Sequence, residues 1–435
     1  MKYFSLNQQA PAVSFQEATI LGQAPDKGLY FPERIPQVNK GLIEALQTTS
    51  NEEIAFQVIH PYVGNEIPDE VLYSIVQETV NFRIPLVTVT DQISSLELFH
   101  GPTLAFKDIG ARFMSRCLGY FVGQQQRKEK VVVLVATSGD TGGAVANGFY
   151  DVEGVEVVIL YPSGKVSSVQ EQQLTTLGKN IQALEINGTF DDCQQLVKQA
   201  FSDQSLTNRL FLTSANSINV ARWLPQQFYY FFALKQWQDQ EHPPVISVPS
   251  GNFGNICAGM LACKSGLPVS HFIAACNAND VVPRYMQTQQ YEPMKAVPTI
   301  SNAMDVGNPS NFVRILELFH QNFPELQQKF TSVSISDFET KATLKRVYEQ
   351  QHYLLDPHGA VGYLALERYL NEHPHEKGIV LETAHPVKFY DVVEPVTGDP
   401  VPLPDALSHI MKLPKMATKM DPSYEALRSF LLEMK

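Results

Sequence analysis

The sequence of 435 residues has few cysteines and no recognisable metal-binding pattern. Its five cysteines include no CxxC pair, and its eleven histidines form no HExxH motif or His/Cys cluster. We therefore expect reduced thiols and no built-in metal site. A basic surplus is also missing, since 33 Lys and Arg stand against 45 Asp and Glu, for a net charge of −12. This balance argues against a nucleic-acid partner.

Long apolar runs are absent as well. No segment approaches the roughly 20 consecutive apolar residues that a membrane span requires, and residues 1–15 lack the apolar core of a signal peptide. We therefore expect a cytoplasmic protein with no membrane partner. Hydrophobic residues make up 44 % of the chain and charged residues 18 %, which suits ordinary globular cores, and the length predicts two to three domains.

Short apolar runs followed by glycine-rich or polar turns and helical patterns predict an α/β fold. These runs are Val131–Thr137, Val155–Tyr161, Val245–Val248 and Gly378–Glu382. They indicate buried parallel strands, an architecture in which ligands bind at the carboxyl ends of the strands. Composition predicts an N-terminal domain (1–95), an α/β domain with the SGDTG loop (96–240) and an α/β domain with the PSGNFGN loop (241–435).

The PSGNFGN segment, Pro249–Asn255, lies between an expected strand and an expected helix. Glycine lets backbone approach a ligand closely, and a helix N-terminus offers unpaired N–H groups to an anion. The segment matches neither GxGxxG nor GxxxxGK[ST], which weakens the dinucleotide and triphosphate interpretations. A phosphate cradle and a plain strand-to-helix turn remain equally open for these residues considered alone.

The SGDTGG segment, Ser138–Gly143, follows the expected strand at 131–137 and could hold a second anion. Asp140 does not suit that role, because a carboxylate repels an anion. It suits an amine or a hydroxyl, or it caps the following helix, and capping is the better interpretation of this segment alone.

Lys107 comes at the expected start of a helix, after a Gly-Pro turn and an apolar stretch, Leu104–Phe106. Most lysines are simply exposed. A lysine in an apolar site, however, has a lowered pKa and can form a Schiff base through its neutral amine. A lysine, a phosphate site and a partner for a ring nitrogen are what pyridoxal phosphate needs, and Thr383, after the run at 378–382, offers a neutral hydroxyl as that partner.

With these segments in view, the sequence resembles the threonine synthase family, pyridoxal-phosphate enzymes of fold type II (the tryptophan-synthase β-like fold), and most of all its longer bacterial and fungal branch. The resemblance extends along almost the whole chain. The motifs that carry it are GLYFPE (28–33), HGPTLAFKDIG (100–110), TSGDTGGAV (137–145), YPSGKVSSVQEQQ (161–173), FDDCQ (190–194), NSINVARWLPQ (216–226), PSGNFGN, NANDVVPR (277–284), SNAMDVGNPSN (301–311), DPHGAVG (356–362) and TAHPVKF (383–389).

The resemblance implies two α/β subdomains around the cofactor plus an extra N-terminal layer. It implies that Lys107 is the catalytic residue and carries the cofactor. The other cofactor-binding residues it implies are Gly251, Asn252, Phe253, Gly254, Asn255 and Thr383. The substrate-binding residues it implies are Thr137, Ser138, Asp140, Thr141, Asn216, Ser217 and Arg222. Asp140 replaces an asparagine of the shorter branch, which leaves its role open.

The implied reaction is that of a lyase in the last step of threonine biosynthesis, from O-phospho-L-homoserine and water to L-threonine and phosphate. The implied partner is this small-molecule substrate, and the implied assembly is a monomer or a homodimer. Two alternatives stay open. One is another fold type II enzyme, such as a serine or threonine dehydratase, although its substrate would bring no phosphate to NSINVAR. The other is a non-catalytic homologue that binds phosphorylated amino compounds.

Overall fold

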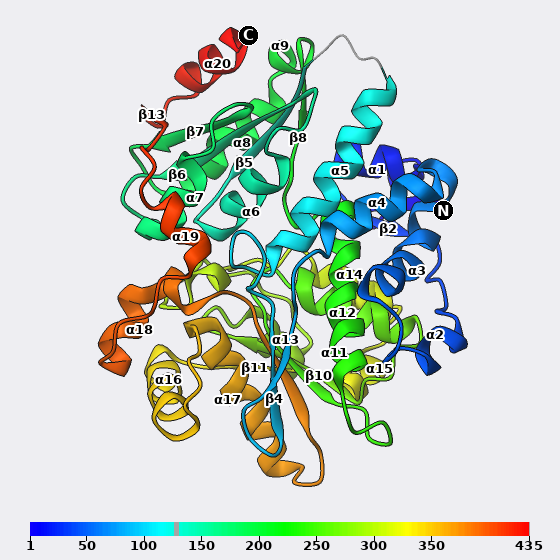
Figure 1. Ribbon diagram of the computed structural model, residues 1–435. Helices are drawn as coiled ribbons and strands as arrows, with labels where there is room; N and C mark the ends of the chain where they lie inside the picture. The colour runs from blue at the N-terminus through cyan, green and yellow to red at the C-terminus, as the bar shows by residue number, and fades with distance from the viewer. Residues whose placement is uncertain (126–129, 435) are drawn as a thin grey trace.

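The computed structural model describes residues 1–125 and 130–434, and these residues form two large sheets (Figure 1). One sheet has the order β11–β10–β9–β12–β4–β3 and is parallel except for the β3–β4 pair. In that order its strands are Phe330–Ser334, His271–Cys276, Val245–Pro249, Gly378–Glu382, Ile93–Glu97 and Leu86–Thr88. The other sheet has the order β13–β7–β6–β5–β8 and is parallel throughout. In that order its strands are Ala417–Met420, Ile181–Ile186, Val155–Pro162, Lys130–Ala136 and Leu210–Thr213.

Helices cover both sheets, which confirms the expected α/β class. Those of the N-terminal layer are α1 (Phe15–Leu21), α2 (Lys40–Glu44), α3 (Asn51–Val63) and α4 (Asp69–Thr79), beside the β1–β2 pair (Tyr3–Ser5, Tyr30–Pro32). Those around the five-stranded sheet are α5 (Lys107–Gln125), α6 (Asp140–Phe149), α7 (Ser168–Thr175), α8 (Phe190–Ser202), α9 (Gln204–Thr207) and α20 (Tyr424–Glu433). The remainder are α10 (Val220–Trp223), α11 (Gln227–Gln236), α12 (Gly254–Lys264), α13 (Val281–Thr288), α14 (Phe312–Leu318), α15 (Phe323–Lys329), α16 (Asp337–Gln351), α17 (Pro357–Glu372), α18 (Tyr390–Thr397) and α19 (Asp405–Ile410).

The local sequence explains the central packing. The middle of β5 reads VVVLV and is buried on both faces, as a strand between two layers of helices must be. Helix α12 is rich in small residues, and a Cβ at its Gly259 would collide with the ring of Tyr230 on α11. The two helices therefore pack closely, and the Tyr230 hydroxyl donates to the carbonyl of Asn255, 2.7 Å away. This contact anchors the PSGNFGN loop to the core.

The two sheets draw on segments from across the boundaries that composition predicts. Strands β3 and β4 join the six-stranded sheet, whose other strands all follow residue 240. Near the C-terminus, β13 pairs with β7, and α20 buries Leu427 and Leu431 against the helices of the five-stranded sheet. We keep the division into 1–95, 96–240 and 241–435 as a proposal about folding units. In this proposal, β4 and β13 pair with strands from a different unit.

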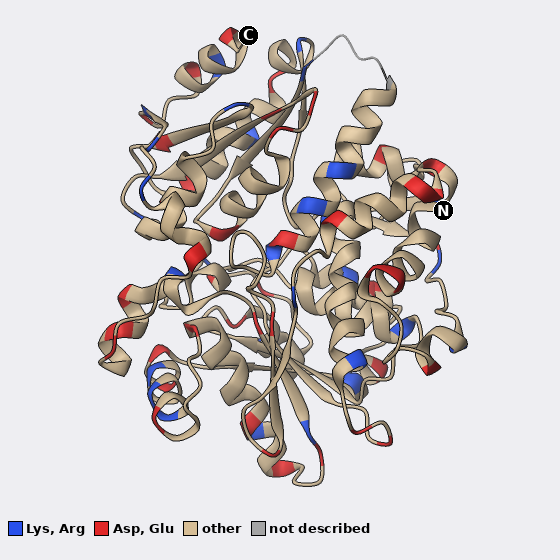
Figure 2. Ribbon diagram, viewed as in Figure 1, with Lys and Arg blue, Asp and Glu red and all other residues tan. Residues whose placement is uncertain are grey.

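Charges are spread over the whole molecule. Figure 2 shows Lys and Arg interspersed with Asp and Glu along the elements of both halves. In the described part of the chain, no helix combines the length and apolar character that crossing a membrane would take.

Candidate active site

The segment before Lys107 is joined to the end of strand β12. Ala105 and Ala384 form an antiparallel bridge. The backbone N–H of Phe106 donates to the Thr383 carbonyl, 2.9 Å away, and the N–H of His385 donates to the Leu104 carbonyl, 3.0 Å away. Helix α5 begins at the next residue, Lys107. The backbone thus places the predicted reactive amine beside the predicted partner of the ring nitrogen.

A cavity of about 620 Å³ lies at this point, at the carboxyl ends of strands from both sheets. Every residue that the sequence predicts for the site lines it. They are Lys107, Thr137, Ser138, Asp140, Thr141, Asn216, Ser217, Arg222, Gly251, Asn252, Phe253, Gly254, Asn255 and Thr383. The segments after β4, β5, β8, β9 and β12 bring them together, as expected for parallel sheets.

Burial changes the chemistry of Lys107. Desolvation lowers the pKa of its amine to about 8; the charge of Asp140 opposes the shift, and the charges of Lys388 and Arg222 add to it. A large part of the amine is therefore neutral near pH 8, as a nucleophile or base must be. The exposed-lysine interpretation does not fit this position.

The PSGNFGN loop forms a tight cradle. Phe253 takes a left-handed conformation (φ 61°) before α12, and no side chain caps the N-terminus of that helix. The Asn252 side chain donates to the Ser217 hydroxyl, 2.7 Å away, and accepts from the N–H of Ser310, 2.6 Å away. The Asn255 amide donates to the Pro249 carbonyl. These side chains shape the loop. Oδ1 of Asn255 also accepts from the N–H of Ile256, 2.9 Å away, so the N–H groups before Ile256 are the ones left to face an anion.

Arg222 is buried, with 2 % of its surface exposed, and it lines the cavity. Its Nη1 donates to the Ala215 carbonyl, and its Nε has no hydrogen-bond partner. Desolvation lowers the pKa of the guanidinium to about 10. Its burial shows that it is not a surface arginine. Within the described ranges, no carboxylate forms an ion pair with it. An unpaired cation that lines a cavity suits an anionic ligand.

Asp140 is the first residue of α6, but its side chain caps nothing. Its Oδ1 lies 2.8 Å from the Nζ of Lys388 and accepts from Nε2 of Gln170, 2.9 Å away. Burial would raise the pKa of this carboxyl, but the charges of Lys388 and Lys107 hold it below its ordinary value. The capping interpretation was wrong, and the alternative role toward an amine agrees with the geometry. Its expected contact with substrate stays a prediction.

Sequence reasoning missed two buried cations near the site. Lys388 has no exposed surface, and it lies in the TAHPVKF segment that was considered only for Thr383. Arg314 on α14 donates to the carbonyls of Tyr30 and Ile218 and to Oδ1 of Asn311, at 2.8, 2.7 and 2.7 Å. The one signal for Arg314 is its place in an apolar helix, FVRILEL.

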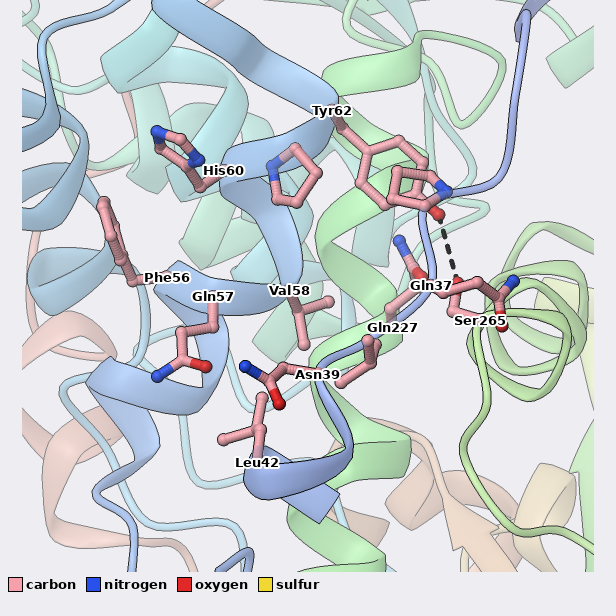
Figure 3. Close-up of a pocket in the computed structure, with 13 residues that line it drawn as sticks. Gln37, Asn39, Leu42, Phe56, Gln57, Val58, His60, Tyr62, Gln227 and Ser265 are labelled. Carbon is pink, nitrogen blue, oxygen red and sulfur yellow. Dashed lines mark hydrogen bonds between the residues drawn. The ribbon is translucent and has the colours of Figure 1, made fainter.

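A second hollow, of about 240 Å³, lies between the N-terminal layer and helix α11 (Figure 3). Its polar lining consists of the amides of Gln37, Asn39, Gln57 and Gln227, the hydroxyls of Tyr62 and Ser265, and the imidazole of His60. It contains no lysine, arginine or carboxylate. It therefore offers no Schiff-base amine, and the larger cavity is the candidate active site. Among residues 1–125 and 130–434, no cluster of His, Cys, Asp and Glu could hold a metal ion.

The larger cavity fits pyridoxal phosphate by its own donor set, with a partly neutral lysine amine, an uncapped helix end and a hydroxyl at a strand end. A family model described as pyridoxal-phosphate dependent enzyme matches residues 95–382, more than half of the chain. The protein is therefore a pyridoxal-phosphate-dependent enzyme, and its fold is fold type II. Models described as the N terminus and the C-terminal part of threonine synthase match residues 2–80 and 359–431.

Individual relatives narrow this class. Threonine synthase of Serratia marcescens is 45 % identical over 433 residues, 99 % of each chain. The crystal structure of threonine synthase from Escherichia coli is 42 % identical and superposes with a TM-score of 0.92 over 100 % of each chain. The structure of threonine synthase with bound PLP from Brucella melitensis is 36 % identical, with a TM-score of 0.93 over 99 % of this chain and 98 % of that one. The chain belongs to the threonine synthase family.

Proposed function

We propose that the protein converts O-phospho-L-homoserine and water to L-threonine and phosphate. The observation that carries the proposal is Arg222, a buried guanidinium with an unpartnered Nε that lines the same cavity as Lys107. This cation is separate from the PSGNFGN cradle, so the cavity offers two anion sites. A cofactor phosphate and a substrate phosphate would occupy both, whereas a serine or threonine dehydratase, whose substrate has a carboxylate but no phosphate, would need only one phosphate site.

Ser217 lies against the cofactor loop, because its hydroxyl accepts from Asn252. We therefore rest the substrate-phosphate site on Arg222. Asn216 and Ser217 stay predicted substrate ligands beside the cradle, and Thr137 keeps its hydroxyl within its own loop, where it accepts from the N–H groups of Gly139 and Gly142 at 3.0 and 2.9 Å. The loop amides and the hydroxyls of Ser138 and Thr141 are then the groups that would receive the substrate carboxylate.

The bound cofactor supplies an electron-withdrawing ring that acidifies the substrate carbon atoms near the amine. Lys107, once free, would take a proton from Cα, give that proton up, and then take a proton from Cβ, and each removal requires its neutral form. The planar guanidinium of Arg222 stabilises the phosphate that leaves from Cγ. A proton would then be added at Cγ, water would add its hydroxyl at Cβ, and a proton would return to Cα, which balances the reaction as threonine and phosphate. Thr383 would face the ring nitrogen as a neutral hydroxyl.

The test is incubation of the purified protein with O-phospho-L-homoserine, in which phosphate, threonine and ammonia are measured together. We expect equal amounts of threonine and phosphate and no ammonia. The Lys107→Ala variant, assayed in parallel, should release neither product. Ammonia release from serine or threonine without turnover of the phosphorylated substrate would favour the dehydratase. A colourless, inert protein that added cofactor does not change would favour the binding homologue.

A further inference from the structure

A second lysine is buried beside the active site, where the proposed reaction gives it no role. Lys388 lies in the single 3₁₀ turn Pro386–Phe389 after β12, and none of its surface is exposed. Its Nζ lies 2.8 Å from Oδ1 of Asp140 and donates to the carbonyl of Thr103, also 2.8 Å away. Lysine is almost never fully buried without a partner, and these two contacts are the partners that Lys388 has.

Four elements hold this arrangement in place. Asp140 begins α6, and Gln170 on α7 donates to the same Oδ1. Gln173, one turn along α7, donates to the Thr103 carbonyl, 3.1 Å away. Thr103 is fixed in turn, because its N–H donates to Oδ2 of Asp108, 2.9 Å away, on the first turn of α5. The Lys388–Asp140 ion pair is therefore linked, through Thr103, to the chain segment that contains Lys107.

The charges around the Lys107 nitrogen come from three other elements. Asp140 on α6 favours its protonated form, whereas Lys388 in the 3₁₀ turn and Arg222 on α10 disfavour it. Asp108 on α5 lies in the same cluster and interacts with Lys388. Asp140 is thus one carboxylate shared between two amines. Lys107 and Asp140 line the same cavity, and without Lys388 the charge of Asp140 would act on Lys107 as its one remaining amine neighbour in this cluster and favour its protonated form.

We propose that Lys388 is a positioning residue that engages Asp140 and so leaves the Lys107 amine free to lose its proton and to move. The proposal deepens the proposed function and rests on it, because it assumes that Lys107 is the reactive amine. Asp140 would then contribute a balanced charge instead of the contact with substrate that the resemblance implies. The pair also explains an aspartate at this position, since a neutral side chain would leave Lys388 without a counter-charge.

The experiment is a charge-balance cycle on the full-length holoenzyme, with the variants Asp140→Asn, Lys388→Met and the double variant. The pH midpoint of the absorbance from the Schiff base at Lys107 is measured for each. Lys388→Met should raise the midpoint and Asp140→Asn should lower it, each by roughly one unit or more, as for an opposite or like charge within reach. The double variant should return close to the wild-type midpoint.

A matched control is Lys415→Met, which removes another ion-paired lysine. Lys415 pairs with Glu171 and Glu185 at 2.6 and 2.7 Å and does not line the cavity, so its loss should leave the midpoint in place. Competitive acetylation of the cofactor-free proteins, followed by mass spectrometry, measures the pKa of the free Lys107 amine. This pKa should be highest in Lys388→Met, intermediate in the wild type and lowest in Asp140→Asn.

Midpoints that stay unmoved in both single variants, or that move in the same direction, would overturn the proposal. If Lys388→Met does not fold, the Asp140→Asn variant alone tests the proposal. An unmoved midpoint in that variant would also overturn it. Borohydride reduction of each protein separates this failure from failure of the proposed function. If the reduced cofactor labels Lys107 but the midpoints stay unmoved, only the role of Lys388 is contradicted. If it labels another residue in the wild type, the assignment of Lys107 itself is contradicted.

Discussion

The backbone N–H of Phe106 lies 2.9 Å from the carbonyl oxygen of Thr383 and donates a hydrogen bond to it. The two residues come from distant parts of the chain, and one of them directly precedes Lys107. Because the bond is made by backbone, the spacing between the chain segments that carry the amine and the strand-end hydroxyl does not depend on flexible side chains. A site built in this way is preorganised for a rigid planar cofactor.

The two glycines of the PSGNFGN loop should differ in their tolerance of alanine. A Cβ on Gly251 would lie 2.7 Å from the Cα of Met304, so the backbone of the facing loop would have to move. A Cβ on Gly254 would approach a side chain, Nδ2 of Asn311, at 3.3 Å. Overpacking against backbone costs roughly 1–3 kcal/mol. We expect Gly251→Ala to weaken cofactor binding about tenfold and Gly254→Ala much less, as cofactor titration of the apoprotein would measure.

The obstruction at Gly251 comes from the protein's own loop and not from the bound phosphate. If Gly254→Ala weakens binding as much as Gly251→Ala, the cradle does not have the shape described here.

Arg222→Ala should reduce kcat/KM for O-phospho-L-homoserine by at least about tenfold, since a charge-assisted hydrogen bond contributes roughly 1.5–3 kcal/mol. Arg222→Lys should recover only part of the loss, because lysine keeps the charge but not the planar fork. Cofactor absorbance should stay normal in both variants. Steady-state kinetics with an intact spectrum and a nearly unchanged kcat/KM in Arg222→Ala would assign the substrate phosphate to other residues.

Arg314 should matter for stability and for cofactor retention. Arg314→Met would leave the carbonyls of Tyr30 and Ile218 and the amide oxygen of Asn311 without their donor, at roughly 1–3 kcal/mol for each buried group. Because Asn311 donates to the Asn252 carbonyl, the loss reaches the cofactor loop. We expect a clear decrease in the free energy of unfolding, measured with urea, and weaker cofactor binding. Arg209→Met, at an exposed position, is the control, and equal stability of the two variants would contradict this role.

The value of kcat should rise with pH through about 8. Burial lowers the pKa of Lys107, and only its neutral amine can accept a proton from the substrate. Below that midpoint the neutral fraction falls about tenfold per pH unit, and above it the rate should level off. Phosphate release at saturating substrate, followed from about pH 6.5 to pH 9.5, would measure the profile. A rate that is flat or falls across this range would mean that the amine is not the limiting base.

Sequence patterns predicted the strands and loops of the site because those signals are local. The apolar run at 131–137 and the glycines of PSGNFGN record a buried strand and a close backbone approach in the residues themselves. The position of Lys388 carries no such record, since a lysine in a short turn is normally exposed and its burial depends on Asp140, far away in the chain. The pairing of β13 with β7 is equally non-local. The composition-based division therefore assigned β13 to 241–435, although its partner strand lies in 96–240.

The most direct test of the account is borohydride reduction of the purified holoenzyme, followed by peptide mapping. We expect reduction to fix the cofactor to the peptide that contains Lys107. Lys388 is the demanding comparison, because it is buried in the same region and pairs with Asp140, which lines the cavity. A label on Lys388, or on Lys198 at the cavity wall, would contradict the assignment of the reactive amine on which the mechanism depends.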